Sequence, residues 1–106
     1  MIEYDLDKSF AALADPTRRA LVERLSAGPA TVSALAAPFA VSLAAVMQHL
    51  KVLEDAGLVT SAKQGRVRTC QIDPLMLRQV ERWVSERRVQ WAQCLDRLDS
   101  FLEEDP

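Results

Sequence analysis

Apolar positions recur at helical spacing in the middle of the chain, over residues 42–56. Three of them fall on one face, at intervals of four and three: Val46, Leu50 and Leu53. Ser42 is suited to cap the first turn of such a helix, and Gly57 is suited to end it. The pattern predicts an amphipathic helix that buries these three apolar residues and exposes the opposite face.

The pattern changes to that of two short strands in residues 58–72. Leu58-Val59 lead into a first strand, and Gln64-Gly65 are predicted to form the turn before a return strand. Basic side chains lie beside this turn or along the return strand: Lys63, Arg66 and Arg68. A helix shaped to enter a groove, followed by a charged hairpin or wing, is the layout of a winged helix-turn-helix. This layout favours DNA binding.

Three shorter helices are predicted before this unit. The first covers residues 6–14, and one of its faces carries Leu6, Phe10 and Leu13. Asp15-Pro16 is a cap followed by a proline suited to a first helical position, so a second helix starts there and runs to about Ser26. Thr31 is suited to cap a short third helix. The last two are predicted to place Leu21, Val22, Leu25, Val32 and Leu35 in the core.

Asp73-Pro74 repeats the cap-plus-proline device and opens a long last helix, over about residues 74–103. Its apolar residues follow a heptad seam interrupted by Arg87: Leu77, Val80, Val84, Trp91, Cys94, Leu98 and Phe101. Such a helix is about 45 Å long at 1.5 Å per residue. Because one small domain would leave much of the stripe exposed, dimerisation through this helix is predicted. The alternative is that the stripe packs on its own domain.

Composition limits the remaining possibilities. The 106 residues suit one domain, and a formal net charge of −2 with pI ≈ 5.3 is unusual for a DNA-binding protein. Four basic and two acidic residues give residues 41–72 a balance of +2, which leaves −4 for the rest. No apolar run approaches the roughly 20 residues that span a bilayer. The acidic N-terminus lacks signal-peptide order, so a cytoplasmic protein without membrane contact is expected.

On a helical wheel of residues 42–56, Ala44, Gln48 and Lys51 lie opposite the apolar face. Gln48 can bond adenine at two points, the alanines allow close approach to a thymine methyl, and Lys51 suits phosphate. His49 lies at the helix edge and is predicted to pack or cap rather than to bind a ligand. The predicted DNA contacts are Ser42, Ala44, Ala45, Met47, Gln48, Lys51, Lys63, Arg66 and Arg68.

Over nearly its whole length the chain resembles the ArsR family of bacterial winged-helix repressors. The matching segments are LADPTRRALVERL (13–25), VMQHLKVLEDAGLV (46–59) and GRVRTCQIDP (65–74). The resemblance implies a homodimer whose first and last helices form the interface, and a repressor, often autoregulatory, that leaves a palindromic operator on double-stranded DNA when a signal arrives. The first helix would then add Leu6 and Phe10 to the seam residues of the last helix.

The chain departs from the metal-sensing members of that family. Residues 31–37, TVSALAA, lack the paired cysteines, and residues 74–106 contain no histidine. Soft and borderline metals need thiolate or imidazole ligands, so no metal site and no cofactor are predicted. The resemblance is therefore to the non-metal-sensing branch, and the effector is unknown.

The sequence distinguishes between three function classes. A DNA-binding repressor is favoured, whereas an acidic pI and an apolar recognition helix would suit a winged-helix protein-interaction module without DNA binding. An enzyme is not predicted, because no phosphate loop or nucleophile–base grouping occurs. A thiol-redox-sensing repressor that uses Cys94 is a variant of the first class, against the alternative that Cys94 is a packing residue. Cys70 is predicted to pack within the return strand.

Overall fold

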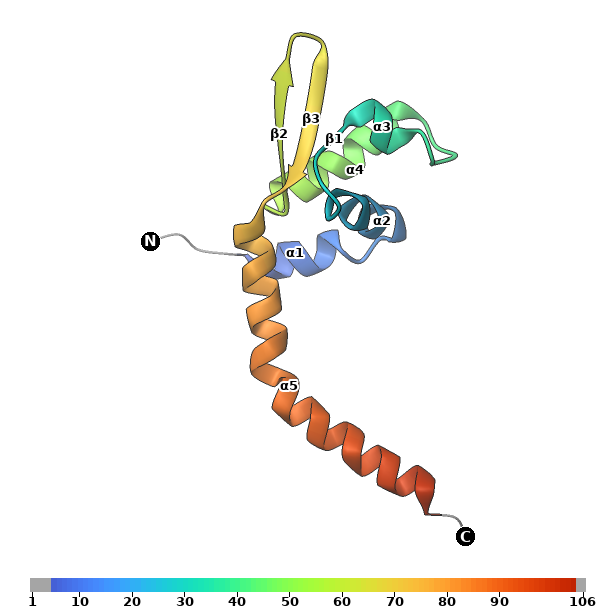
Figure 1. Cartoon of the computed structure of the whole chain (residues 1–106), viewed down its shortest axis with the longest axis vertical. Helices are drawn as coiled ribbons and strands as arrows, with labels where there is room; N and C mark the ends of the chain where they lie inside the picture. Colours follow the sequence, from blue (N-terminus) through green and yellow to red (C-terminus); the bar gives the residue numbers. More distant parts are fainter. Residues whose placement is uncertain (1–4, 105–106) are drawn as a thin grey trace.

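The computed structural model describes residues 5–104, which form five helices and a small antiparallel sheet (Figure 1). In chain order the elements are α1 (Leu6–Ala12), α2 (Pro16–Leu25), β1 (Ala30–Thr31), α3 (Val32–Ala36), α4 (Leu43–Asp55), β2 (Val59–Gln64), β3 (Val67–Ile72) and α5 (Pro74–Glu103). The predicted fold class, mainly helical with a β-hairpin wing, is confirmed. Helix α1 is two residues shorter than predicted: Leu13 is its C-cap, and the Ala14 N–H bonds to the Ala11 carbonyl three residues back instead of continuing the helix.

The helix starts follow the polar residues that the sequence placed there. Each predicted cap accepts a hydrogen bond from a backbone N–H in the first turn: Asp15 from Arg18 at 3.0 Å, Thr31 from Ala34 at 3.1 Å, Ser42 from Ala45 at 3.1 Å and Asp73 from Leu75 at 3.0 Å. These bonds satisfy donors that have no partner inside the helix. Local sequence chemistry therefore sets where α2, α3, α4 and α5 begin.

The wing differs from the prediction at its turn and in its number of strands. Gln64 pairs with Val67, so the turn is Gly65-Arg66 rather than Gln64-Gly65. Gly65 has a φ of 64°, which the first central position of a type II′ hairpin turn requires. A third strand, β1, pairs Ala30 with Cys70 on the other edge of β3. A strand of two residues is too short to show an alternating pattern, so the sequence does not predict β1.

The core lies between the sheet and helices α2, α3 and α4. Val46, Leu50 and Leu53 are at most 3% exposed, which confirms the predicted inner face of α4. Leu21, Leu25, Val32 and Leu35 are also buried as predicted, whereas Val22 is only partly buried. Met76 is a core residue that the heptad pattern of the last helix did not predict. Its side chain lies beneath the turn after α4, where a Cβ added to Gly57 would be 3.7 Å from the Met76 Cγ.

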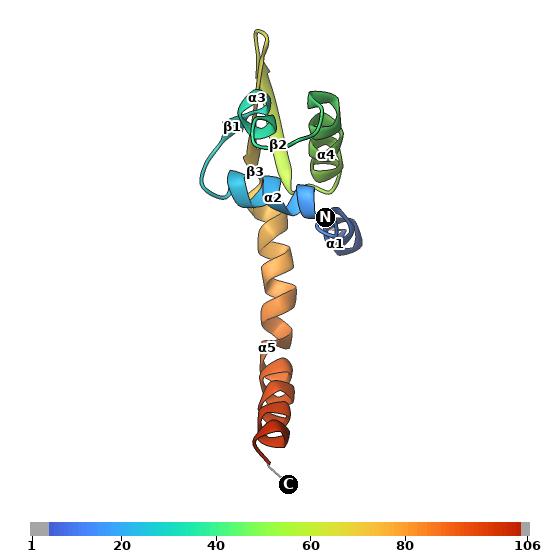
Figure 2. The same cartoon turned by 90° about the vertical axis from the view of Figure 1, so that its right-hand side faces the viewer.

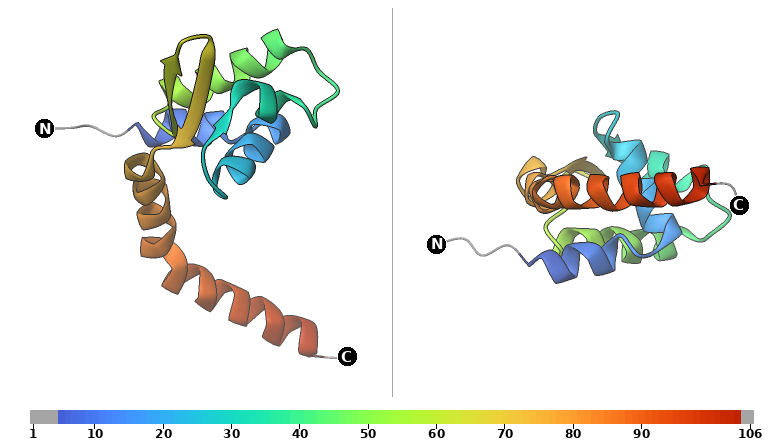
Figure 3. Two further views of the ribbon diagram at one scale, coloured as in Figure 1. Left: turned by 45° about the horizontal axis from the view of Figure 1, so that its top comes forward. Right: turned by 90° about the horizontal axis from the view of Figure 1, so that it is seen from below.

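Helix α5 leaves the domain after its first turns, and its second half extends away from every other element (Figures 1, 2 and 3). Around its middle, Trp83 contacts Phe10 edge-on at 5.4 Å between ring centroids and Trp91 at 6.0 Å. The Arg87 guanidinium carbon lies 4.2 Å above the Trp83 ring. This cation–π contact explains the one polar residue in the seam. From Arg88 onward every described side chain is exposed, so this part of the stripe does not pack on its own domain.

Candidate nucleic-acid interface

Helix α4 presents a solvent-facing side because its other side is fixed in the core. Val46, Leu50 and Leu53 anchor it, and the Ser42 cap holds its first turn. Ala44, Met47, Gln48 and Lys51 are all exposed, whereas Ala45 is half-buried at the helix edge. The N-terminal half of α4 is therefore free to approach a partner, as the recognition helix of a helix-turn-helix must be.

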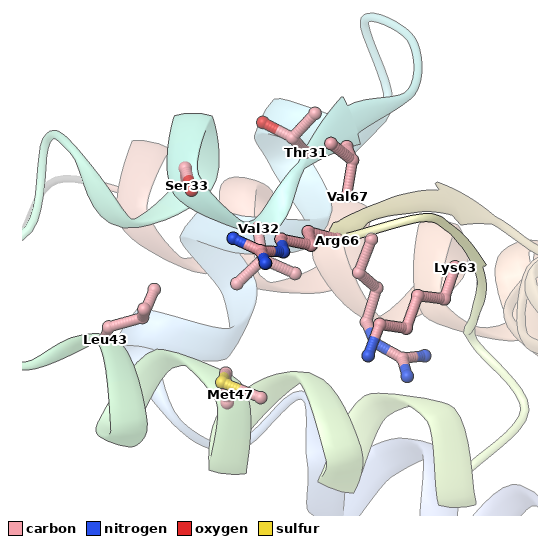
Figure 4. Close-up of a pocket in the computed structure, with 9 residues that line it drawn as sticks. Thr31, Val32, Ser33, Leu43, Met47, Lys63, Arg66 and Val67 are labelled. Atoms are coloured by element: carbon pink, nitrogen blue, oxygen red, sulfur yellow. The ribbon is translucent and has the colours of Figure 1, made fainter.

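A groove of about 390 Å³ separates α4 from the wing and the start of α3. Its lining comes from β1, the start of α3, the first turns of α4 and the wing: Thr31, Val32, Ser33, Leu43, Met47, Lys63, Arg66, Val67 and Arg68. Figure 4 shows Leu43 and Met47 projecting from α4 toward α3 and the basic side chains of the wing. A second hollow of about 220 Å³ continues the surface past Met47 and Arg68 to Lys51. The arrangement brings an apolar floor and a basic rim together on one face.

The basic side chains of the wing lie close enough to repel one another and so destabilise the hairpin. Lys63 and Arg68 are directly opposite partners in the β2–β3 register, and Arg66 lies at the tip. Like charges in facing positions destabilise a strand pair. Among residues 5–104, no carboxylate forms a salt bridge with any of the three; Arg68 instead donates to Ser61 Oγ at 2.8 Å. An anionic partner such as a phosphate backbone would relieve this repulsion.

A polar network fastens the back of α4 to the first two helices. Arg18 donates to the carbonyl of Ala12 at 2.6 Å and to that of Ala11 at 3.3 Å, and its Nη1 lies 3.4 Å from His49 Nδ1. His49 Nδ1 is also 3.9 Å from an Asp15 carboxylate oxygen. The Arg18 backbone N–H lowers the pKa of Asp15, and the nearby His49 and Arg18 side chains lower it further. His49 therefore packs within this network, as predicted for a residue at the helix edge.

The two cysteines lie in different environments. Cys70 is fully buried, which confirms its predicted packing role, and burial followed by the nearby Glu54 raises the pKa of its thiol. Cys94 is exposed in the outer half of α5, where Arg97 Nη2 donates to its Sγ at 3.2 Å. No cation was predicted from the sequence to lie beside this thiol. Helical geometry supplies one, because residues three apart share a face.

The structure gathers some of the predicted DNA contacts and separates others. Met47, Lys63, Arg66 and Arg68 line the groove together, and Lys51 lies in the adjoining hollow with an ion pair to Asp55 at 3.5 Å. Ala44, Ala45 and Gln48 belong to α4 and Ser42 is its N-cap, but none of the four lines the groove. Sequence reasoning missed Val32, Leu43 and Val67, although Leu43 lies one helical turn before Met47 on the same side.

The predicted interface residues divide into two groups. Leu6 and Leu77 are partly buried against the core of their own domain, and Val80 and Val84 are half-buried. Phe10 is 40% exposed, and the outer seam residues are also exposed: Trp91, Cys94, Leu98 and Phe101. The free apolar surface is therefore concentrated in the outer half of α5.

Residues 5–104 contain neither a metal-ligand cluster nor a membrane-spanning helix. No group of three or more histidine, cysteine, aspartate or glutamate side chains there is placed to hold a metal ion. Over the same residues, no helix combines the length and the apolar character needed to cross a bilayer.

Comparison with known proteins identifies relatives of this chain. Residues 13–62 match a family described as a helix-turn-helix domain. The HTH-type transcriptional regulator Rv2034 of Mycobacterium tuberculosis is 44% identical over 94 residues, which cover 85% of this chain and 88% of that protein. The transcriptional repressor SdpR of Bacillus subtilis is 25% identical over 79 residues, covering 74% of this chain and 88% of the repressor.

A solved structure extends the similarity to three dimensions. The crystal structure of the ArsR family transcriptional regulator RHA00566 superposes with a TM-score of 0.76 and is 52% identical. The similarity covers 82% of this chain and 96% of that one. Sequence and fold therefore agree along almost the entire length of that relative.

Proposed function

Because this chain belongs to the ArsR family of winged helix-turn-helix transcriptional regulators, we propose that it acts as a dimeric repressor of the non-metal-sensing branch. In this proposal the chain, which is not an enzyme, works in the cytoplasm on a palindromic operator in double-stranded DNA. Helix α4 enters the major groove, and the wing contacts the neighbouring backbone. The nine residues predicted from the sequence to touch DNA remain the proposed contacts.

The observation that carries the proposal is the basic rim around the groove between α4 and the wing. Lys63, Arg66 and Arg68 converge there from a hairpin, although the chain as a whole has a net charge of −2. Concentrated cations on an acidic protein point to an anionic partner at that face. Gln48 and Ala44 lie on the exposed side of α4, within reach of base edges once α4 enters the major groove of the DNA.

The outer half of α5 supports the dimer in this proposal. Leu98 is 50% exposed and Phe101 71% exposed, and both lie on the seam that begins in the domain. A second copy related by a two-fold axis would cover this stripe and present two α4 helices to successive major grooves, about 34 Å apart. A signal that altered the dimer geometry would change that spacing, and with it the affinity for DNA.

The exposed thiol of Cys94 gives the redox variant a specific observation. Its position on the seam would bring it near its copy across a two-fold axis, and Arg97 lies beside it. An intersubunit disulfide formed by an oxidant would then change the dimer geometry. The protein-interaction module without DNA binding is the second candidate, because Leu43 and Met47 make the centre of the groove apolar.

The experiment that tests the proposal is a binding titration of the purified protein against duplex DNA from its own upstream region, at several salt concentrations. Specific binding with a steep salt slope is expected, since phosphate contacts release counterions. The titration is repeated with an oxidant and with a Cys94→Ser variant as its control. Loss of binding only in the oxidised wild type supports the redox variant. No binding to this DNA, or to a random duplex pool at low salt, favours the interaction module.

Two substitutions test the assignment of contacts. Gln48→Ala is expected to relax sequence preference, with a loss of about 1–3 kcal/mol against the preferred site only. Arg66→Ala is expected to weaken binding to all sequences and to reduce the salt slope by about one. Affinities on specific and scrambled duplexes at three salt concentrations measure both effects. If both variants bind like the wild type throughout, the site assignment is wrong.

A further inference from the structure

Three exposed apolar side chains lie inside the basic groove. Leu43 is 51% exposed, Met47 48% and Val67 51%, and all three line the space between α4 and the wing. Leu43 and Met47 are one turn apart on α4 and project into the groove from the same side (Figure 4). A surface whose only task was to hold phosphates would not need apolar groups at its centre.

The charges around these side chains select the kind of partner. The lining contains three cations and no carboxylate, so an apolar protein surface would have to bury Lys63, Arg66 and Arg68 without an anionic partner. Double-stranded DNA offers a partner for both the basic and the apolar side chains of the groove. Its phosphates meet the cations, and the thymine C5-methyl is the apolar group that a base edge presents in the major groove.

We propose that Leu43 and Met47 read thymine methyl groups in the operator, and that they contribute sequence specificity beside Gln48. This inference rests on the proposed DNA-binding function. Residues four apart on a helix are separated by about 6 Å along its axis. Successive base pairs are about 3.4 Å apart. The two side chains therefore fit two methyl groups about two base-pair steps apart in each half-site.

The test compares thymine with uracil, which differs from it only by the absence of that methyl group. An operator is first obtained by selecting duplexes that the full-length protein binds from a random pool. Each thymine of one half-site is then replaced in turn by deoxyuridine, and the affinity is measured at constant salt. A loss of about four-fold is expected at one or two positions, and little change is expected at the others.

Protein variants assign the effect to the proposed side chains. Met47→Gln and Leu43→Gln are each expected to bind the thymine and uracil duplexes equally at one of the sensitive positions. Val52→Gln is the matched control, because Val52 is 40% exposed on the same helix but does not line the groove. This control should keep the full four-fold preference for thymine.

The outcomes separate this inference from the function on which it rests. Specific binding that no uracil substitution changes would overturn the proposal that Leu43 and Met47 contact thymine methyl groups. The proposed repressor function would still stand. Absence of any sequence-specific binding would overturn the proposed function itself. The inference is also wrong if the wild type binds all uracil-substituted duplexes with equal affinity while Leu43→Gln or Met47→Gln dissociates the dimer. The apolar surface would then be a contact between two copies of the chain.

Discussion

At the scale of single residues, Arg18 holds α4 through contacts that no spacing in the sequence indicates. Its guanidinium bonds to two carbonyls near the end of α1 and reaches His49 on α4, thereby joining three helices. Arg19, the next residue, donates only to the Leu13 carbonyl from an exposed position. Two adjacent arginines of equal charge therefore have different structural importance.

Arg18→Ala is expected to lower the free energy of unfolding by about 1–3 kcal/mol, because it removes the donor to the partly buried Ala12 carbonyl. Arg19→Ala, the matched control, is expected to change it by less than about 0.5 kcal/mol. Urea unfolding of both variants measures the difference. Equal losses would show that the network adds nothing beyond surface charge.

Asp15 makes the same network sensitive to acid. The Arg18 N–H bond lowers the pKa of this carboxyl below 3.8 in the folded chain, so its contribution to stability is full above that value. It is lost as the pH falls through the folded-state pKa. Asp15→Asn keeps a good cap but cannot titrate. Between about pH 6 and pH 3, the free energy of unfolding should fall less steeply for this variant than for the wild type. Parallel curves would contradict this assignment.

At the scale of elements, α4 depends on a cap at one end and a glycine at the other. Ser42 accepts the Ala45 N–H bond at 3.1 Å, and Gly57 takes a φ of 79° where the chain turns into β2. The first turn of α4 also carries Leu43 and approaches the groove. Fraying at this end would therefore disturb the surface proposed to meet DNA.

Ser42→Ala is expected to cost about 1 kcal/mol of stability and to weaken DNA binding, because the first turn of α4 loses its cap. Ser42→Asn should retain the cap and most of the stability. Thermal unfolding and operator affinity are measured for both variants. A serine hydroxyl that acts only on phosphate would give a different result: both variants would keep wild-type stability and lose affinity equally.

At the scale of the whole molecule, the outer half of α5 gives the chain its longest dimension of 65 Å. One side of it carries the seam, and the other carries Val89, which is 68% exposed. Apolar side chains are exposed on both sides of the outer half of α5, but they form a continuous stripe only on the seam side. The seam alone extends back to the packed start of the helix.

Leu98→Glu is expected to raise the dissociation constant of the proposed dimer at least about a hundred-fold, because a two-fold axis repeats the buried charge. Val89→Glu adds the same charge on the opposite side of α5 and should leave the dimer intact. Sedimentation velocity over a range of protein concentrations measures both. A wild type that stays monomeric at every concentration would rule out the proposed interface.

Local chemistry made much of this fold predictable. The four caps, the inner face of α4 and the hairpin depend on interactions between residues a few positions apart, which the sequence displays directly. The wing turn was misplaced by one residue, because both Gln64-Gly65 and Gly65-Arg66 contain the glycine that such a turn needs. Strand β1 was missed because its pairing with β3 is long-range.

Interactions between chain neighbours specified the order of the five helices and the hairpin, the helix starts and the basic character of the wing. Tertiary structure decided which of those charges share one groove with Leu43 and Met47, and that Met76 enters the core while Trp91 remains outside. It also decided that Arg18 holds α4 and that Arg87 stacks on Trp83. The reason is physical: caps and helical faces arise from neighbours along the chain, whereas grooves, networks and core membership arise from elements meeting in space.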